Sequence, residues 1–258
     1  LYSKDSSEKY SIQVAEGIYL HHEYADSIFQ QVVNSKLLAE KEYKYSDLGY
    51  YLLHPIMENL CGQKLNEFTM NNFYKPLGLS TMGFLPKERI QKEQIVPTEF
   101  DYYYRSQLLQ GDVHDMGAAM FGGVAGHAGL FSNANDLAIF MQMYLQGGEY
   151  AGERFFEKET LEEFTKCQFC EDENRRGAGF DKAALTEQDG GPACDCNPSP
   201  TAFGHSGFTG TLAWVDPAED FVYVFLSNRI HPTAENKKLL KMNVRTNIMD
   251  VFYQAIRK

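Results

Sequence analysis

The chain has 258 residues, of which 43% are hydrophobic and 23% charged, with 18 Phe and 16 Tyr. This composition indicates a folded globular protein with a substantial core and excludes long disordered stretches. The net charge of −11 argues against a nucleic-acid binder and against docking on an anionic membrane surface, since both need Lys and Arg. No apolar run approaches the roughly 18 residues of a membrane span. The chain begins at Leu1 without a signal peptide, as a processed protein or a fragment would.

The first part of the chain is predicted to be helical. Residues 1–10 are polar and indicate an exposed, loosely held arm. Residues 12–38 show helical spacing, and residues 48–60 form a second helix that bends at Pro55 and stops at Gly62. The candidate buried side chains of the first helix are Val14, Ile18, Phe29, Val32 and Val33.

The middle of the chain alternates between helices and loops. Residues 64–75 are predicted to form a third helix that ends in the turn at residues 76–78. Residues 85–128 are rich in Gly, Pro, Tyr and His without a clear period, which favours loops and short turns. The best-marked helix lies between Ser132 and Gly148, because Ser and Asn side chains offer N-caps, apolar residues recur at helical spacing, and two glycines close it.

After Phe203 the pattern changes to strands. Residues 211–215 and 221–226 are rich in β-branched and aromatic side chains and flank a Pro-containing turn, which predicts a hairpin. A closing helix follows, with apolar residues on one face from Leu240 to Ala255. Helices followed by a hairpin that a last helix covers predict an α+β fold.

A single domain of three regions is expected for residues 1–258, because no repeat or low-complexity linker divides the chain. Residues 1–150 are its mostly helical part, 151–202 a loop region with cysteines, and 203–258 the hairpin and the closing helix.

Two short motifs are candidates for chemistry. Tyr45-Ser46-Asp47 precedes the second helix, and His205-Ser-Gly-Phe-Thr-Gly-Thr211 leads into the hairpin. Taken alone, each has an ordinary structural explanation, since Asp47 is a good N-cap and a Gly-rich stretch before a strand is usually only a turn.

Their combination with three further motifs is more specific. Residues 76–79 (Pro-Leu-Gly-Leu), 113–115 (Val-His-Asp) and 122–129 (Gly-Gly-Val-Ala-Gly-His-Ala-Gly) stand between them in the chain. In this order the motifs resemble the superfamily of serine β-lactamases, penicillin-binding proteins and esterases, in its class C-like branch, from about Tyr43 to Asn228. The resemblance implies a β-lactamase-like fold, with a helical subdomain and an antiparallel sheet flanked by helices, here incomplete at its N-terminal side.

The resemblance also implies roles for individual residues. In that family a serine, helped by a lysine one helical turn later, attacks an acyl carbonyl and forms an acyl-enzyme. Tyr45 matches the proton-shuttling tyrosine, and His205 stands where many relatives carry a lysine. Ser206 and Gly207 would line the substrate, and the N–H of Phe208 would donate to the oxyanion. No cofactor is implied for catalysis.

This sequence departs from the family pattern in two places. Asp47 replaces an asparagine that donates to the substrate, and a carboxylate only accepts, which disfavours penicillin-like side chains and suits a cationic or hydroxyl-bearing group. The only Ser-x-x-Lys match before Tyr45, Ser6-Ser-Glu-Lys9, lies too close to Tyr45 and in a polar arm. The serine is therefore expected upstream in a longer parent protein, whose missing N-terminal segment would be a partner of this chain. An inactive relative is the alternative.

The cysteines predict a structural feature rather than a catalytic one. Cys61 lies alone on a helical pattern and is expected to be buried. The other four suit a tetrathiolate zinc site that pins the long loop, or two disulfides in an oxidising compartment. Zinc is slightly favoured, because close cysteines are poor disulfide partners within a pair. These four are Cys167, Cys170, Cys194 and Cys196.

Three functions remain open on this reading. The first is a serine hydrolase domain that acts on a small peptide or ester, and the second is an inactive binding module of the same fold. The third is a zinc-stapled interaction domain. His114, Asp115 and His127 suggest a further metal, but hydrogen bonds that stabilise loops explain them better. The family resemblance alone implies a bacterial periplasmic or cell-envelope setting.

Overall fold

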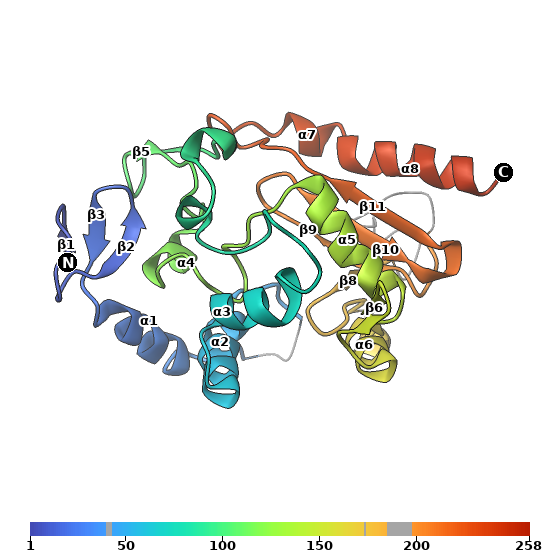
Figure 1. Ribbon diagram of the computed structural model, residues 1–258, viewed down its shortest axis with the longest axis horizontal. Helices are drawn as coiled ribbons and strands as arrows, with labels where there is room; N and C mark the ends of the chain where they lie inside the picture. Colours follow the sequence, from blue (N-terminus) through green and yellow to red (C-terminus); the bar gives the residue numbers. More distant parts are fainter. Residues whose placement is uncertain (40–42, 173, 185–197) are drawn as a thin grey trace. The chain divides into compact units, whose positions relative to one another are not determined.

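The structure is a computed structural model that describes residues 1–39, 43–172, 174–184 and 198–258 (Figure 1). Helices and antiparallel sheets share the chain, and the predicted α+β class is confirmed. Within the described residues, no helix combines the length and the apolar character that crossing a bilayer requires.

The chain divides into two compact units, which are described separately. Unit 1 comprises residues 1–132 and 231–233, and unit 2 comprises residues 133–230 and 234–258.

A small antiparallel sheet opens unit 1, where a helix was predicted. Its strands β1 (Tyr2–Ser3), β2 (Ile12–Ala15) and β3 (Ile18–Leu20) are arranged in the order β1-β3-β2. Gly17 makes the β2–β3 turn at φ +66°. The prediction of a helix across these residues is wrong, because a glycine turn separates two short strands. The N-terminal arm is exposed as predicted but is not loosely held, since β1 pairs with β3.

Helices follow the small sheet. They are α1 (Tyr24–Val33), α2 (Leu48–Cys61) and α3 (Leu65–Thr69), and α3 continues into a π-helical turn at Met70–Tyr74. The prediction for α2 is confirmed, since it contains Pro55 and ends at Gly62 in the left-handed conformation. Two burial predictions are wrong: Val33 is 54% exposed, and the Cys61 side chain is exposed.

Loops and short elements complete unit 1, as predicted for residues 85–128. They are the 3-10 turns Pro86–Glu88 and Lys92–Gln94, the strands β4 (Phe100–Asp101) and β5 (Gln107–Leu108), and the helix α4 (Met116–Met120). A buried core of Val14, Leu20, Val113, Ala118 and Ala119 joins the small sheet to α4. Residues far apart in the chain are therefore held together inside unit 1.

Unit 2 is built on an antiparallel sheet in the order β11-β10-β9-β8. Its strands are β8 (Asp181–Lys182), β9 (Phe203–Ser206), β10 (Leu212–Asp216) and β11 (Phe221–Phe225). The predicted hairpin is β10–β11, with Trp214 opposite Tyr223.

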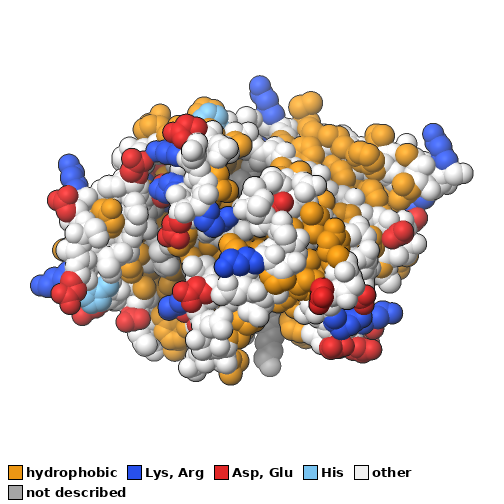
Figure 2. Space-filling view, in the orientation of Figure 1, with side chains coloured by type: hydrophobic (Ala, Val, Ile, Leu, Met, Phe, Trp, Pro, Cys, Tyr) orange, Lys and Arg blue, Asp and Glu red, His pale blue; other side chains and the backbone are white. Residues whose placement is uncertain are grey.

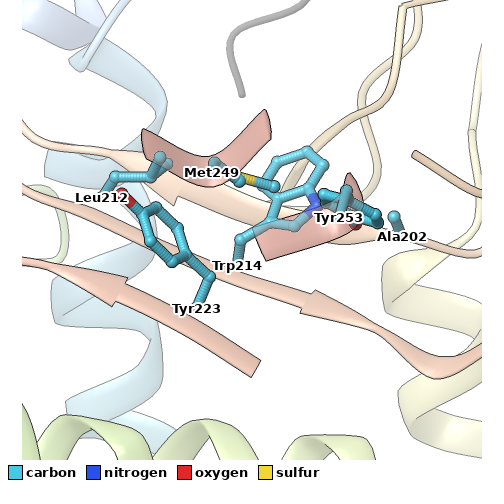
Figure 3. Packing of buried hydrophobic residues seen from close by; sticks show 6 residues of the cluster. All are labelled: Ala202, Leu212, Trp214, Tyr223, Met249 and Tyr253. Carbon is cyan, nitrogen blue, oxygen red and sulfur yellow. The ribbon is translucent and has the colours of Figure 1, made fainter. Parts of the chain in front are cut away.

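Alternate residues of β10 face opposite sides of the sheet. Leu212 and Trp214 pack against Met249 and Tyr253 of α8 (Val244–Ile256), as Figure 3 shows. Ala213 and Val215 face the other side and pack with Met141 of α5 (Ala134–Leu145). Both helices were predicted, and together they cover the two faces of a sheet whose strands have the two-residue period.

Unit 2 also contains several short elements. They are β6 (Glu149–Tyr150), β7 (Glu153–Arg154), α6 (Lys158–Thr165), α7 (Lys238–Lys241) and the 3-10 turns Cys170–Asp172 and Pro217–Glu219.

Candidate functional site

The Tyr-Ser-Asp motif of unit 1 leads into α2. Ser46 Oγ accepts a hydrogen bond from the Leu48 N–H at 3.2 Å. Asp47 occupies the N-cap position, but its side chain makes no capping bond, so the prediction of Asp47 as the capping side chain is wrong. Tyr45 is 60% exposed. The motif thus presents an accessible phenol and leaves the Asp47 carboxylate available for other contacts.

Asp47 meets two other motifs. Ligand atoms of Asp47, Asp115 and His127 all lie within 4.8 Å of one another. Asp115 caps α4, since its Oδ1 accepts from the Ala118 N–H at 2.7 Å and also contacts His127 Nε2 at 2.9 Å. Burial raises the pKa of the Asp115 carboxyl, but the hydrogen bonds from His127 and Ala118 hold it below its ordinary range. Three of the motifs that carried the resemblance therefore converge.

The same three side chains could be considered as a metal site. Within the described part of the chain, no other three or more His, Cys, Asp or Glu residues have ligand atoms close enough together to hold one metal ion. Asp115 Oδ1 already accepts from Ala118 and His127, so hydrogen bonding explains its arrangement without an ion.

Tyr51 belongs to this cluster, although sequence reasoning missed it. Its ring centroid lies 4.6 Å from that of His127. Burial raises its pKa to about 12, and the carboxylates of Asp115 and Asp47 add to the shift. A phenol in this environment keeps its proton and cannot serve as a base near neutral pH. Its position four residues after Asp47, one helical turn, was the available signal.

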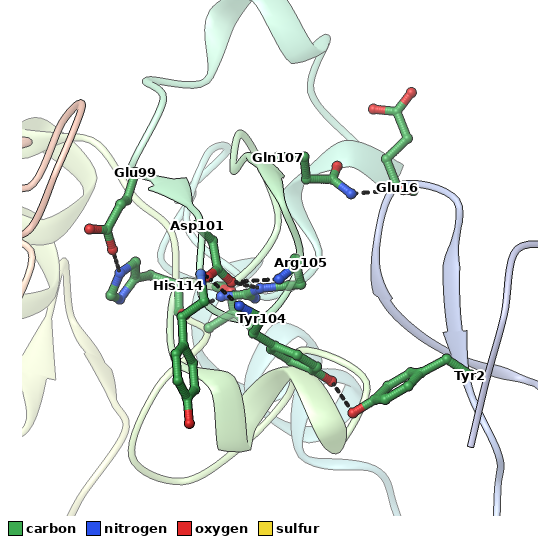
Figure 4. Close-up of polar contacts among 10 residues, drawn as sticks. Tyr2, Glu16, Glu99, Asp101, Tyr104, Arg105, Gln107 and His114 are labelled. Atoms are coloured by element: carbon green, nitrogen blue, oxygen red, sulfur yellow. Dashed lines mark hydrogen bonds and ion pairs between the residues drawn. The ribbon is translucent and has the colours of Figure 1, made fainter.

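His114 stabilises the neighbouring loop. Its Nε2 lies 2.5 Å from Glu99 Oε2, and Arg105 donates to the backbone carbonyls of Val113 and His114 (Figure 4). Arg105 is itself held by a buried ion pair with Asp101 at 2.7 Å. The prediction that His114 and His127 make hydrogen bonds that stabilise loops is confirmed.

His205 of unit 2 lies on β9, opposite Ala213. Arg176 Nη1 lies 3.0 Å from His205 Nε2, and His205 Nδ1 lies 2.7 Å from the Ser206 carbonyl. A guanidinium only donates, so Nε2 accepts and the ring proton lies on Nδ1, where it can bind Ser206. Arg176 also pairs with Asp181 at 3.2 Å. Arg176 was not predicted, because it lies in an irregular segment without a motif.

The residues after His205 form a tight turn. The Gly207 N–H donates to Thr211 O at 2.8 Å, and the Gly210 N–H donates to Gly207 O at 3.0 Å. A Cβ at Gly207 would lie 2.2 Å from Thr211 Oγ1, so this position has no room for a side chain. Phe208 is 63% exposed, with the Arg229 guanidinium 4.8 Å from its ring centroid. The turn therefore places an exposed residue, Phe208, at the position that the resemblance gives to the oxyanion donor.

The predicted site residues therefore fall into two groups. Tyr45 and Asp47 belong to unit 1, whereas His205, Ser206, Gly207 and Phe208 belong to unit 2. The approach of Tyr45 to His205 stays a prediction. Ser6 and Lys9 are exposed and lie outside any helix, which agrees with the rejection of Ser6 as the nucleophile.

The cysteines differ from the favoured prediction. Cys167 and Cys170 form a disulfide with each other. Their sulfurs are therefore not thiolate ligands, and a tetrathiolate zinc site does not fit these residues. The expectation that close cysteines would not pair is also wrong here. Cys194 and Cys196 lie outside the described residues.

The comparisons with known proteins agree with this geometry. The family model described as Beta-lactamase matches residues 9–243, which span both units. The chain belongs to the β-lactamase family of serine hydrolases.

Its curated relatives are longer proteins. A protein of Escherichia coli K12 named "Putative D-alanyl-D-alanine carboxypeptidase" is 37% identical over 210 residues, which cover 75% of this chain and 47% of the relative. A protein of Salmonella typhi with the same name is 35% identical over 210 residues, with 76% and 47% covered. The chain thus spans about half the length of these relatives.

Solved structures show the same fold at low identity. A β-lactamase from Mycobacterium bovis has a TM-score of 0.55 and 19% identity, over 83% of this chain and 65% of that one. A penicillin-binding-protein homologue from Caulobacter crescentus has a TM-score of 0.54 and 18% identity, over 80% and 58%. These similarities establish the β-lactamase-like fold.

Proposed function

We propose that this chain is the larger part of an acyl-transfer serine hydrolase that acts on a peptide ending in D-alanyl-D-alanine or on a related ester. The observation that carries the proposal is a family match across both units together with the tight turn after His205. The names of the relatives at 35–37% identity support the peptide as the first substrate to test.

The proposed reaction has two steps. As a phenolate, Tyr45 would take the proton of the serine hydroxyl while the serine oxygen bonds to the acyl carbon, and it would pass that proton to the leaving amine or alcohol as the bond to the acyl carbon breaks. Water then attacks the acyl-enzyme and gives a proton to Tyr45, the bond between the acyl carbon and the serine oxygen breaks, the acid product leaves, and Tyr45 returns the proton to the serine. The Phe208 N–H would stabilise the negative charge on the carbonyl oxygen in both steps. Ser206 and Gly207 would lie along the substrate.

The nucleophile is proposed to precede Leu1 in a parent protein, because Ser6 lies outside any helix and the match covers only 47% of the Escherichia coli relative. The remaining part of that protein would be the partner of this chain. The outer face of α8 supports this: Val251 is 64% exposed, Phe252 48% and Ile256 45%. Figure 2 shows hydrophobic side chains gathered over α8 at the upper right.

A bacterial envelope setting is proposed from the family resemblance and the bacterial relatives. The Cys167–Cys170 disulfide supports it, because disulfides persist in the periplasm and are rare in reducing compartments.

The proposal is tested on the full-length protein with a fluorophosphonate probe and with D-alanine release from a peptide ending in D-Ala-D-Ala. We expect label on a serine upstream of Leu1 and loss of both label and D-alanine release in a Tyr45→Phe variant. Label on Ser6 alone, or none, contradicts the hydrolase. Peptide binding without turnover identifies an inactive binding module instead.

Asp47 gives a second test, on substrate class. Because a carboxylate cannot donate to an acyl-amide carbonyl, we expect the natural protein to react poorly with penicillins. Asp47→Asn restores a donor and should raise the rate of penicillin acylation. An unchanged rate contradicts the role of Asp47 in selectivity.

A further inference from the structure

The turn Gly207–Gly210 is anchored through its carbonyl groups. Gly207 O accepts from the Gly210 N–H, and the Arg229 N–H donates to Thr209 O at 3.1 Å. Ser227 Oγ donates to Gly210 O at 2.8 Å. Carbonyls that are bound by the surrounding structure fix the planes of the peptides to which they belong.

Arg245, near the start of α8, contacts the backbone at Gly207 and at Thr211, which directly follows the turn. Its Nη1 donates to Thr211 O at 2.8 Å and lies 3.5 Å from Gly207 O. Thr211 O also accepts the Gly207 N–H, so the guanidinium contacts the acceptor of the hydrogen bond that closes the turn and the carbonyl of the residue that donates it. Arg245 is held in turn, because Tyr223 Oη donates to its backbone carbonyl at 3.0 Å.

The direction of the Phe208 N–H follows from these bonds. In a planar trans peptide the C=O and the N–H point in opposite directions. The Gly207 carbonyl points toward the Gly210 N–H and the Arg245 guanidinium, so the Phe208 N–H points away from them. An oxyanion donor must hold such a fixed direction before the reaction, because donors that reorient during the step lose much of their effect.

The guanidinium also brings positive charge to the turn. Burial, followed by the neighbouring charge of Arg229, lowers the pKa of Arg245 from its ordinary value. A guanidinium remains charged despite such a shift. Two cations therefore lie close to the peptide that would face a developing negative charge.

We infer that Arg245 is a positioning residue for the oxyanion-binding turn, because it holds the Gly207 and Thr211 carbonyls and thereby fixes the direction of the Phe208 N–H. This inference rests on the proposed function. Arg245 itself touches no reacting atom.

The test uses Arg245→Met in the full-length protein, with Arg257→Met as the matched control. Arg257 lies just beyond the other end of α8, where it pairs with Glu219 at 2.7 Å and covers the Tyr253 ring, so its loss removes the same charge far from the turn. We expect Arg245→Met to lower kcat by about 10- to 100-fold and to leave KM within about threefold of its original value. A misdirected Phe208 N–H would stabilise the transition state less, whereas binding of the substrate in its ground state would not change. Arg257→Met should keep both values. Arg245→Lys, which retains a charged donor, should recover part of kcat.

Amide hydrogen exchange separates positioning from general stability. In Arg245→Met the Gly207 and Gly210 amides should exchange at least about tenfold faster while the β10–β11 amides stay protected. Equal loss of protection across the sheet, an unchanged kcat, or a rise in KM alone overturns the inference. If the wild type hydrolyses nothing, the proposed function fails, and the exchange rates still decide whether Arg245 holds the turn.

Discussion

Arg176 donates a hydrogen bond to Nε2 of His205 at 3.0 Å, and the same guanidinium pairs with Asp181. The motif resemblance predicts that His205 stands where many relatives carry a lysine. The contact with Arg176 makes Nε2 the acceptor nitrogen of this histidine. The Arg176 guanidinium brings a positive charge to this position from a different segment.

Removal of this charge should affect activity more than stability. We expect Arg176→Met to lower kcat/KM about tenfold in the full-length protein, because the variant removes a positive charge and a hydrogen-bond donor next to the predicted site residue His205. Arg175→Met is the control, since Arg175 pairs with Asp181 at 3.0 Å and is adjacent in sequence. Steady-state kinetics on both variants measure the effect. Equal losses in the two variants would assign the role to Asp181 rather than to the contact with His205.

The buried ion pair of unit 1 should make stability depend on pH. Burial raises the pKa of Asp101, but hydrogen bonds from Arg105 and the Tyr104 N–H, with the guanidinium charge, bring it below the ordinary value. The stabilisation is therefore present above the unfolded pKa, near 3.9, and is lost as the pH falls through the folded pKa. Urea unfolding measured from about pH 7 down to about pH 2 should show this loss.

Asp101→Asn should lower the free energy of unfolding at neutral pH by about 3–5 kcal/mol, because it leaves the Arg105 charge buried without its partner. It should also flatten the acid limb of the stability curve. Glu16→Gln is the control, because the Glu16–Lys92 pair lies on the surface and should leave the unfolding midpoint unchanged. A similar effect of both substitutions would contradict the assignment to burial.

Much of the fold could be predicted from periodicity. The helix α2 with its stop at Gly62, the helix α5 and the β10–β11 hairpin all have long or strongly patterned segments. The strands β2 and β3 were missed, because they are only four and three residues long and their apolar residues also suit a helix. Short elements depend on tertiary pairing rather than on local pattern.

The candidate site was predictable only in part. The motifs around Tyr45 and His205 were visible because their residues are adjacent in sequence. The contacts of Asp47 with Asp115 and His127, and of Arg176 with His205, join segments that are distant in the chain. Such contacts depend on the paths of irregular loops, and loops have no repeating sequence pattern from which the contacts could be predicted.

The cysteines give a prediction about redox state and metal. Iodoacetamide on the native, non-reduced protein should alkylate Cys61, which is exposed, and spare Cys167 and Cys170. Peptide mass mapping after digestion should recover the last two as a linked pair. Chelation with EDTA should leave the Tm unchanged, because bonded sulfurs cannot hold zinc. A stoichiometric zinc content, or a Tm that falls on chelation, would contradict this.

The last prediction concerns Gly210, where backbone strain and a side-chain clash can be separated. Gly210 has φ +109°, and a Cβ there would lie 2.3 Å from Ser227 Oγ. Gly152, between β6 and β7, has φ +86° with nothing within 4 Å of the same atom. Both alanine variants carry the strain of positive φ, about 1–2 kcal/mol. Only Gly210→Ala also pushes Ser227 from the carbonyl that it anchors. We therefore expect both variants to lose stability in urea, but only Gly210→Ala to lose kcat, by at least about tenfold. If Gly152→Ala lost as much activity, the turn after His205 would have no special role in the reaction.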